Sequence, residues 1–159
     1  MDGPSLPNIL NENIMQPIQT SNTWQWNGYR NSWITLDGYK MQSVSGGGHW
    51  GGGMWINAFD LGRYGYLYLR EGRWKDKQLI SKKWITMMTT PSELNPLYGL
   101  LWWLNTNNKW IPNAPESMYA AYGTGNWVFV DKENDLVIVL RWVDSKAVNG
   151  FWEKVIDSL

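Results

Sequence analysis

Residues 126–142 read NWVFVDKENDLVIVLRW, and this stretch decides the fold class. Asn126 to Asp131 and Leu136 to Trp142 are rich in β-branched and aromatic residues, which is typical of strands. Four polar residues, Lys132 to Asp135, connect them, so the two strands are predicted to pair as a hairpin. Val137 to Leu140 is a continuous apolar run, which predicts a central strand that is covered on both faces.

The sequence on either side of this hairpin extends the sheet and closes it with a helix. Tyr98 to Asn105 and Ser117 to Tyr122 have the composition of strands and precede the hairpin. After the hairpin, apolar residues recur at helical spacing: Val148, Phe151, Trp152, Val155, Ile156 and Leu159. Such a stripe is typical of an amphipathic helix that packs on a sheet.

Two helices are predicted before the sheet. The first spans residues 58–70, and its apolar face consists of Leu61, Tyr64, Gly65 and Tyr68. Asn57 and Asp60 stand where a reciprocal cap belongs, and Gly72 follows the end of the helix. The second helix runs from its cap Ser81 to about Thr89, and its apolar face consists of Trp84, Ile85 and Met88.

Residues 1–44 are predicted to hold only short elements. Asn8 to Met15 favours a short helix that ends before Pro17. Asp37-Gly38 is a hairpin turn between two short strands, Trp33 to Leu36 and Tyr39 to Val44. The whole order of helices, an antiparallel sheet and a closing helix predicts an α+β fold in a single domain over residues 1–159.

The composition excludes several kinds of site. The 159 residues carry 14 basic and 14 acidic side chains, and this balance argues against a nucleic-acid partner. Cysteine is absent and His49 is the single histidine, so thiolate chemistry and a multi-histidine metal site are excluded and no cofactor is expected. The sequence contains no apolar run of about 18 residues, so no membrane span is predicted. Thirteen tryptophans suit core packing and recognition alike.

Six glycines surround the histidine in the run Ser45-Gly46-Gly47-Gly48-His49-Trp50-Gly51-Gly52-Gly53-Met54. Glycine loses more backbone entropy on ordering than any other residue. Because a capped helix follows, the run predicts an ordered loop at the rim of a pocket. For His49, a loop residue that bonds a nearby carbonyl is favoured over a substrate contact. Trp50 and Trp55 are equally compatible with a pocket lining and with core packing.

Taken in order, several segments resemble the C-terminal part of the β-lactamase-related serine hydrolases, a group that includes class C β-lactamases, penicillin-binding proteins and esterases. The resemblance runs from about Ile14 to the end, with landmarks at residues 14–18, 45–63, 79–81, 98–103 and 122–131. The last landmark resembles the strand entry Gly-Gly-Gln/Asn-aromatic-X-X-Val-Asp-Pro of that group. The order and spacing of the landmarks carry the resemblance.

This resemblance implies hydrolysis of an amide or ester through an acyl-enzyme. Such enzymes use a serine in a Ser-X-X-Lys motif, where the lysine lies one helical turn away and takes the proton. No serine of this chain stands in that motif, which in the family precedes the matched region. We therefore expect no catalytic residue here, a missing nucleophile-bearing half, and no activity of this chain by itself. Tyr29-Arg30-Asn31 follows the Pro17 landmark, whereas the family's Tyr-X-Asn precedes it, so a chance match is favoured.

The resemblance implies a substrate-binding set of His49, Trp50, Tyr122 and Gly123, without a metal ligand. The family's Lys-Thr-Gly strand is nearest to residues 119–123, where Tyr122 replaces the expected glycine and Gly123 follows. A backbone edge that hydrogen-bonds substrate is the expected intact feature. Trp102 and Trp103 point to opposite faces of a strand, so at most one of them lines a cleft.

The expected partner is a small amide or ester substrate, and apolar surface left by the missing half predicts self-association. Family members are often periplasmic or secreted, but the family's N-terminal targeting region is not in this chain, so localisation is left open. A second interpretation is a non-catalytic binding module whose tryptophans stack on sugars or peptides. Labelling by a β-lactam or a fluorophosphonate would distinguish the two interpretations.

Overall fold

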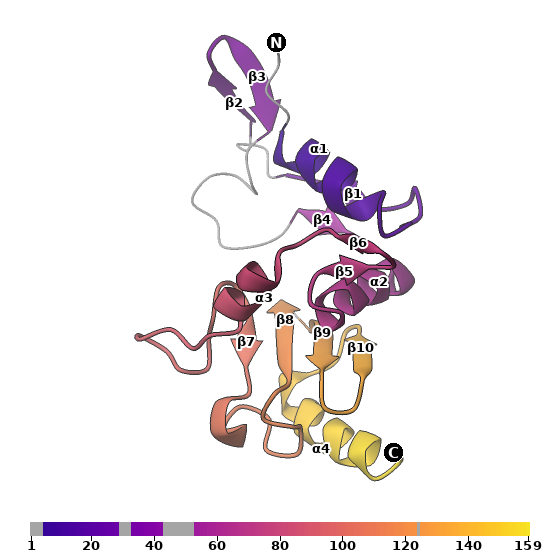
Figure 1. Ribbon diagram of the computed structural model, residues 1–159, viewed down its shortest axis with the longest axis vertical. Helices are drawn as coiled ribbons and strands as arrows, with labels where there is room; N and C mark the ends of the chain where they lie inside the picture. Colours follow the sequence, from indigo (N-terminus) through magenta and orange to yellow (C-terminus); the bar gives the residue numbers. More distant parts are fainter. Residues whose placement is uncertain (1–4, 29–32, 43–52, 124) are drawn as a thin grey trace. The chain divides into compact units, whose positions relative to one another are not determined.

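The computed structural model describes residues 5–28, 33–42, 53–123 and 125–159 (Figure 1). The chain divides into two compact units, Met1–Asp60 and Leu61–Leu159, and the boundary falls in the first turn of helix α2 (Ala58–Leu69). This division concerns compactness alone, so the single domain predicted over residues 1–159 stays a prediction.

The first unit contains the predicted short helix and hairpin, and also a pair of two-residue strands that the sequence did not predict. Helix α1 (Leu6–Leu10) continues as one π-helical turn, η1 (Asn11–Met15). Strand β1 (Gln25–Trp26) pairs with β4 (Met54–Trp55), and β2 (Trp33–Leu36) pairs with β3 (Tyr39–Gln42). The predicted hairpin turn is confirmed, because Asp37 and Gly38 both have positive φ, +52° and +83°.

The first turn of α2 is held by the predicted cap. The Asp60 backbone N–H donates to Asn57 Oδ1 (2.9 Å), and Asn57 Nδ2 donates in return to Asp60 Oδ2 (2.7 Å). Asp60 is fully buried and also accepts from the backbone N–H of Ser21 (3.0 Å). These contacts give Asp60 a structural role in capping, as the sequence indicated.

The second unit is built on a four-stranded antiparallel sheet (Figure 1). Its strands are β7 (Trp103–Leu104), β8 (Tyr119–Gly123), β9 (Asn126–Asp131) and β10 (Leu136–Leu140), in the order β10-β9-β8-β7. The predicted hairpin is confirmed, with Leu136 opposite Asp131 and Leu140 opposite Trp127. Neighbours in the sheet are therefore also neighbours in the chain.

The position predicted for the apolar run at the end of this hairpin is wrong. Strand β10 lies at the edge of the sheet and all its residues are half-buried, whereas five of the six residues of β9 are buried. Both faces of β10 do carry packing, since Val137 and Val139 contact one apolar cluster and Ile138 and Leu140 contact the other. The run is continuous because both faces are packed, and this pattern does not require a strand on each side.

Helices cover the two faces of the sheet. Residues of α2 and α3 (Lys82–Met88) form one buried cluster with alternate residues of β8 and β9. On the other face, Val148 and Trp152 of α4 (Ser145–Ile156) pack with Trp127 and Phe129. The shorter elements of this unit are β5 (Arg73–Trp74), β6 (Lys77–Gln78) and η2 (Thr106–Asn108).

The predicted start of α3 and end of α2 are confirmed, but some side chains predicted to be buried are exposed. Ser81 caps α3 as predicted, through a bond from the Trp84 N–H (3.1 Å), but the Trp84 side chain is exposed. Gly72 has φ +79° beyond α2, and its N–H bonds to the Leu67 carbonyl (2.8 Å). At the end of the chain, Ile156 and Leu159 are exposed, because the buried stripe of α4 consists of Val148 and Trp152.

The strand predicted over Tyr98 to Asn105 is wrong in extent. Only β7 is regular, with a single bridge between Tyr98 and Trp103, because Leu101 takes φ +63° and breaks the extended backbone. Trp102 and Trp103 still point to opposite faces, as expected. Trp102 packs on Tyr68 and Tyr119, whereas Trp103 stacks on Trp110.

Candidate functional site

The predicted substrate-binding residues fall into two groups. Tyr122 and Gly123 form the end of β8. His49 and Trp50 lie outside the described residues, as does the Tyr-X-Asn at residues 29–31. The site is therefore built from the end of β8 and from the segments of the second unit beside it.

The end of β8 offers a free backbone edge. Strand β8 pairs with β9 along its whole length but with β7 only through its first two residues. The Asn105 N–H donates to the Met118 carbonyl (3.1 Å), which places the backbone groups of residue 118, and by alternation those of residues 120 and 122, on the β7 side. The same register would bring Leu101 opposite Tyr122, but β7 begins two residues later. The N–H and C=O of Tyr122 thus face an edge that no described strand covers.

Large apolar side chains near the ends of these strands are exposed. Leu101 is 81% exposed, Trp142 is 83% exposed and Tyr122 is 39% exposed. Leu101 and Trp142 both adopt positive φ, +63° and +59°, a backbone region that bulky residues seldom occupy. Such strain is kept only where the surroundings impose it, and it is frequent at ligand sites.

A hollow of about 400 Å³ lies beside the Tyr122 ring, lined by Tyr122, Gly125, Trp142, Val143, Asp144 and Ser145. Tyr122 stacks on Trp127 with 3.7 Å between ring centroids, which fixes one wall. The Val143 N–H donates to the Gly125 carbonyl (3.0 Å), and this bond joins the loop after β8 to the loop after β10. Gly125 has φ +75°, a backbone region that favours glycine, and a Cβ there would make a tight contact of 3.2 Å with the Val143 carbonyl oxygen.

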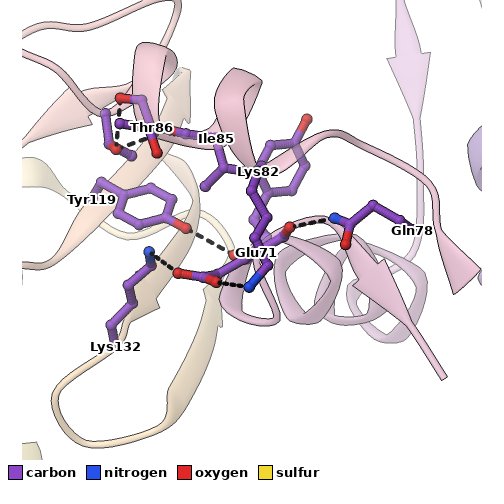
Figure 2. A network of polar contacts seen from close by, with 9 residues as sticks. Glu71, Gln78, Lys82, Ile85, Thr86, Tyr119 and Lys132 are labelled. Carbon is purple, nitrogen blue, oxygen red and sulfur yellow. Dashed lines mark hydrogen bonds and ion pairs between the residues drawn. The ribbon is translucent and has the colours of Figure 1, made fainter. Parts of the chain in front are cut away.

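The opposite end of β8 is organised by charge. Glu71 accepts from Lys82 (3.1 Å) and lies 3.5 Å from Lys132, while its carbonyl accepts from Gln78 (2.8 Å) (Figure 2). The hydrogen bond from Lys82 is the first cause that holds the pKa of the Glu71 carboxyl below its usual value. The charged groups of this network are paired with one another. Their contacts link the end of α2 with the start of α3 and with the β9–β10 hairpin. A second hollow, of about 350 Å³, lies between Tyr119 and Lys132.

Buried tyrosines next to this network act as hydrogen-bond donors. Burial raises the pKa of Tyr119 above its usual range, and its hydroxyl donates to the Tyr68 carbonyl (3.1 Å). Burial likewise raises the pKa of Tyr64 and of Tyr68, whose hydroxyls lie 2.8 Å apart. These phenols therefore stay protonated and are unsuited to act as general bases near neutral pH.

Two further properties concern the described part of the chain alone. No three histidine, cysteine, aspartate or glutamate side chains gather there in a way that could hold a metal ion. None of the helices described there has the length and apolar character needed to cross a bilayer.

Sequence reasoning named Tyr122 and Gly123 as substrate-binding residues through the resemblance, and this stays a prediction. It did not name Leu101, Trp142, Asp144 or Ser145. One local signal was available for the last three. Asp144 is the cap of α4, with Oδ1 accepting from the Lys146 N–H (2.9 Å), and aspartate is among the residues preferred at a helix N-cap, so a helix start near Trp142 could have been predicted. The prediction of a strand through Trp142 concealed this signal.

Comparison with known proteins identifies the fold. No protein-family profile matches the chain, and neither does any curated protein sequence. A candidate 6-aminohexanoate-dimer hydrolase from Bacillus anthracis is similar in structure, with a TM-score of 0.64 and 19% identity over 97% of this chain. A candidate β-lactamase from Bacteroides dorei has a TM-score of 0.56 and 13% identity over 95% of this chain.

These two likenesses confirm the predicted α+β fold of the β-lactamase type. The resemblance to the β-lactamase-related serine hydrolases is thus confirmed at the level of the fold. The chain spans 37% of the length of the first structure and 51% of the second.

Proposed function

We propose that this chain is the C-terminal part of a serine hydrolase domain of the β-lactamase-related type, which acts on a small amide or ester through an acyl-enzyme. The observation that carries the proposal is the uncovered backbone edge at Tyr122, in a fold shared with two structures described as hydrolases. The partial coverage of both structures supports a chain that supplies one portion of such a domain. The nucleophile then belongs to the complementary portion.

In this proposal the chain binds and orients the substrate. An extended substrate adds to the edge of β8, where the Tyr122 N–H donates to a substrate carbonyl and the Tyr122 C=O accepts from a substrate N–H. The side of Gly123 is open, since a Cβ at that residue would meet no atom within 4 Å. Holding the substrate in this way lowers the entropy cost of attack by the serine.

The chemistry proceeds on groups outside this chain. The serine Oγ of the complementary portion attacks the substrate carbonyl carbon while a lysine takes the hydroxyl proton. The bond to the amine or alcohol breaks, that group leaves with the proton, and an ester to the serine remains. Water then cleaves the ester and releases the acid. The name of the Bacillus anthracis structure refers to a linear amide, and this favours amides as the first substrates to assay.

Covalent labelling tests the proposal. The chain is co-expressed with the portion of the Bacillus anthracis hydrolase that this chain does not cover, where the family resemblance implies the serine of a Ser-X-X-Lys motif, and a fluorophosphonate probe is added. We expect labelling of that serine to depend on this chain, and no labelling of the chain by itself. An adduct on a serine of the pure chain, or a stable complex that is neither labelled nor hydrolytic, would contradict the proposal. The second outcome would favour the non-catalytic binding module.

The backbone edge has its own test in the same complex. Tyr122→Pro removes the N–H that faces the free edge and leaves the bonds to β9, because those come from alternate residues. Tyr122→Ala removes the same ring but keeps the N–H. We expect the proline variant to lose at least about tenfold more kcat/KM than the alanine variant, a difference of about 1.4 kcal/mol in transition-state binding.

A further inference from the structure

We infer that the hollow between Tyr122 and Trp142 is a second binding subsite, which takes a neutral sugar ring. The inference rests on the proposed function only in placing substrates at this end of the sheet. The subsite lies on the face of the sheet that α4 covers, since Ala120, two residues before Tyr122, packs with Trp152 of that helix. The backbone edge of β8 and the hollow are therefore adjacent but distinct surfaces of one strand end.

The walls of the hollow are preformed. Its aromatic surface is the Tyr122 ring, which is held by stacking on Trp127, a residue only 2% exposed. Trp127 Nε1 also donates to the Val143 carbonyl (3.4 Å), and Arg141 Nη1 donates to Asn126 Oδ1 (3.3 Å). These bonds fix both loops that form the hollow. Its volume of about 400 Å³ falls in the range of small-ligand sites.

Packing within the described residues does not account for the conformation of Trp142. Its ring is 83% exposed, so it contributes little to the core, and its backbone is held at φ +59°. A left-handed backbone favours glycine or asparagine, whereas this chain places its largest apolar side chain there. Strain together with an exposed aromatic ring is what a ligand platform requires, because the ring gains its packing only when ligand is bound.

The charges around the hollow favour a neutral ligand. Asp144 lines it and presents a carboxylate, and aromatic ring faces are themselves negative, so an anion is disfavoured. Asp144 and Ser145 stand at the start of α4, where the positive end of the helix dipole offsets the carboxylate and the negative ring faces. Neither sign of charge is favoured, which leaves an uncharged ligand.

The hydrogen-bonding groups favour a ring that carries hydroxyls. Asp144 uses Oδ1 for the helix cap, while no described residue bonds its Oδ2. The hydroxyl of Ser145 is likewise unbonded within the described residues, and it both donates and accepts. A sugar ring combines an apolar C–H face, suited to stacking on indole and phenol, with hydroxyls at its rim that meet an acceptor and a hydroxyl. A linear aliphatic amide has no such flat face.

The test measures binding to the whole chain without any hydrolysis. Cellotetraose, chitotetraose and maltotetraose are titrated by calorimetry and by saturation-transfer NMR, beside N-acetyl-6-aminohexanoate as a linear amide. We expect at least one sugar to bind, and Trp142→Ala to weaken it at least about tenfold. Asp144→Asn keeps a cap of equal quality and loses the charged acceptor, so we expect a several-fold loss without a change in helicity.

Trp84→Ala, which removes an exposed tryptophan of α3, is the matched control and should leave the affinity unchanged. The inference is overturned if no sugar binds the folded chain at millimolar concentration, or if Trp142→Ala and Trp84→Ala bind equally well. It is also overturned if the linear amide binds in a Trp142-dependent manner and the sugars do not. Since the proposed function is tested by covalent labelling in the complemented domain, the two can fail separately.

Discussion

Gly65 and Gly62 lie one turn apart in α2, and the structure predicts opposite effects for the same substitution. A Cβ at Gly65 would lie 2.6 Å from Val137 Cγ1 and 2.8 Å from Val128 Cγ2, distances that require a neighbour to move. Both neighbours are β-branched residues of the sheet, with stiff side chains. A Cβ at Gly62 would approach only Val139 Cγ2, at 4.0 Å, which is ordinary contact.

The magnitudes follow from two opposing terms. Replacing glycine by alanine inside a helix stabilises it by about 1 kcal/mol. Overpacking a close contact costs about 1–3 kcal/mol. We therefore expect Gly62→Ala to raise the free energy of unfolding by about 0.5–1 kcal/mol, and Gly65→Ala to lower it by about 1 kcal/mol. Adding Val137→Ala to Gly65→Ala makes room for the methyl group, so the double variant should be more stable than the sum of the single effects by about 0.5–3 kcal/mol.

Urea titration followed by tryptophan fluorescence measures the three single variants, the double variant and the unaltered chain. The reasoning is refuted if Gly65→Ala stabilises the chain as much as Gly62→Ala does, or if Val137→Ala and Gly65→Ala are additive. Either result would mean that α2 does not approach the sheet as closely at Gly65 as the structure indicates.

Three further predictions concern the core, the charge network and the apolar surface. Trp152→Ala should cost about 3–5 kcal/mol, because the ring is fully buried between α4 and the sheet, and a loss below about 1 kcal/mol in denaturant titration would show that α4 is not docked there. Glu71 has a lowered pKa in the folded state, so its stabilisation is present above its unfolded pKa of about 4.5 and is lost as the pH falls through the folded value. The urea midpoint of Glu71→Gln should therefore change less between pH 6 and about pH 3 than that of the unaltered chain. The pure chain should self-associate, and a monodisperse monomer at high concentration in light scattering, without an apolar patch that binds dye, would count against a missing complementary portion.

What the sequence predicted well depends on neighbours in the chain. The cap of Asn57 and Asp60, the cap of Ser81 and the turn at Asp37-Gly38 are local devices, and all three are confirmed. The edge position of β10 is a property of the whole sheet, and apolar packing on both faces imitates a central strand. The break at Leu101 is likewise set by its surroundings, because nothing in leucine favours a positive φ.

The candidate site likewise has features that local sequence indicates and features that depend on the whole fold. Tyr122 and Gly123 were predicted because a resemblance marked the segment, but the free edge beside them exists only because β7 ends early. Trp142 was placed in a strand because of its composition. The chain next to it is held by the bond between Val143 and Gly125, residues 18 apart in sequence, and no local pattern encodes such a contact.

The order of strands in the second unit also bears on how the chain folds. From β8 through β10 to α4, each element packs beside the one that precedes it in the chain, so short connections close every pairing. Contacts between residues near in sequence cost little loop entropy and form quickly. The contacts of Gly65 with Val128 and Val137 span more than sixty residues and close a far longer loop. The β9–β10 hairpin is therefore the natural nucleus, and substitutions in it should slow refolding, whereas those in α2 should mainly speed unfolding.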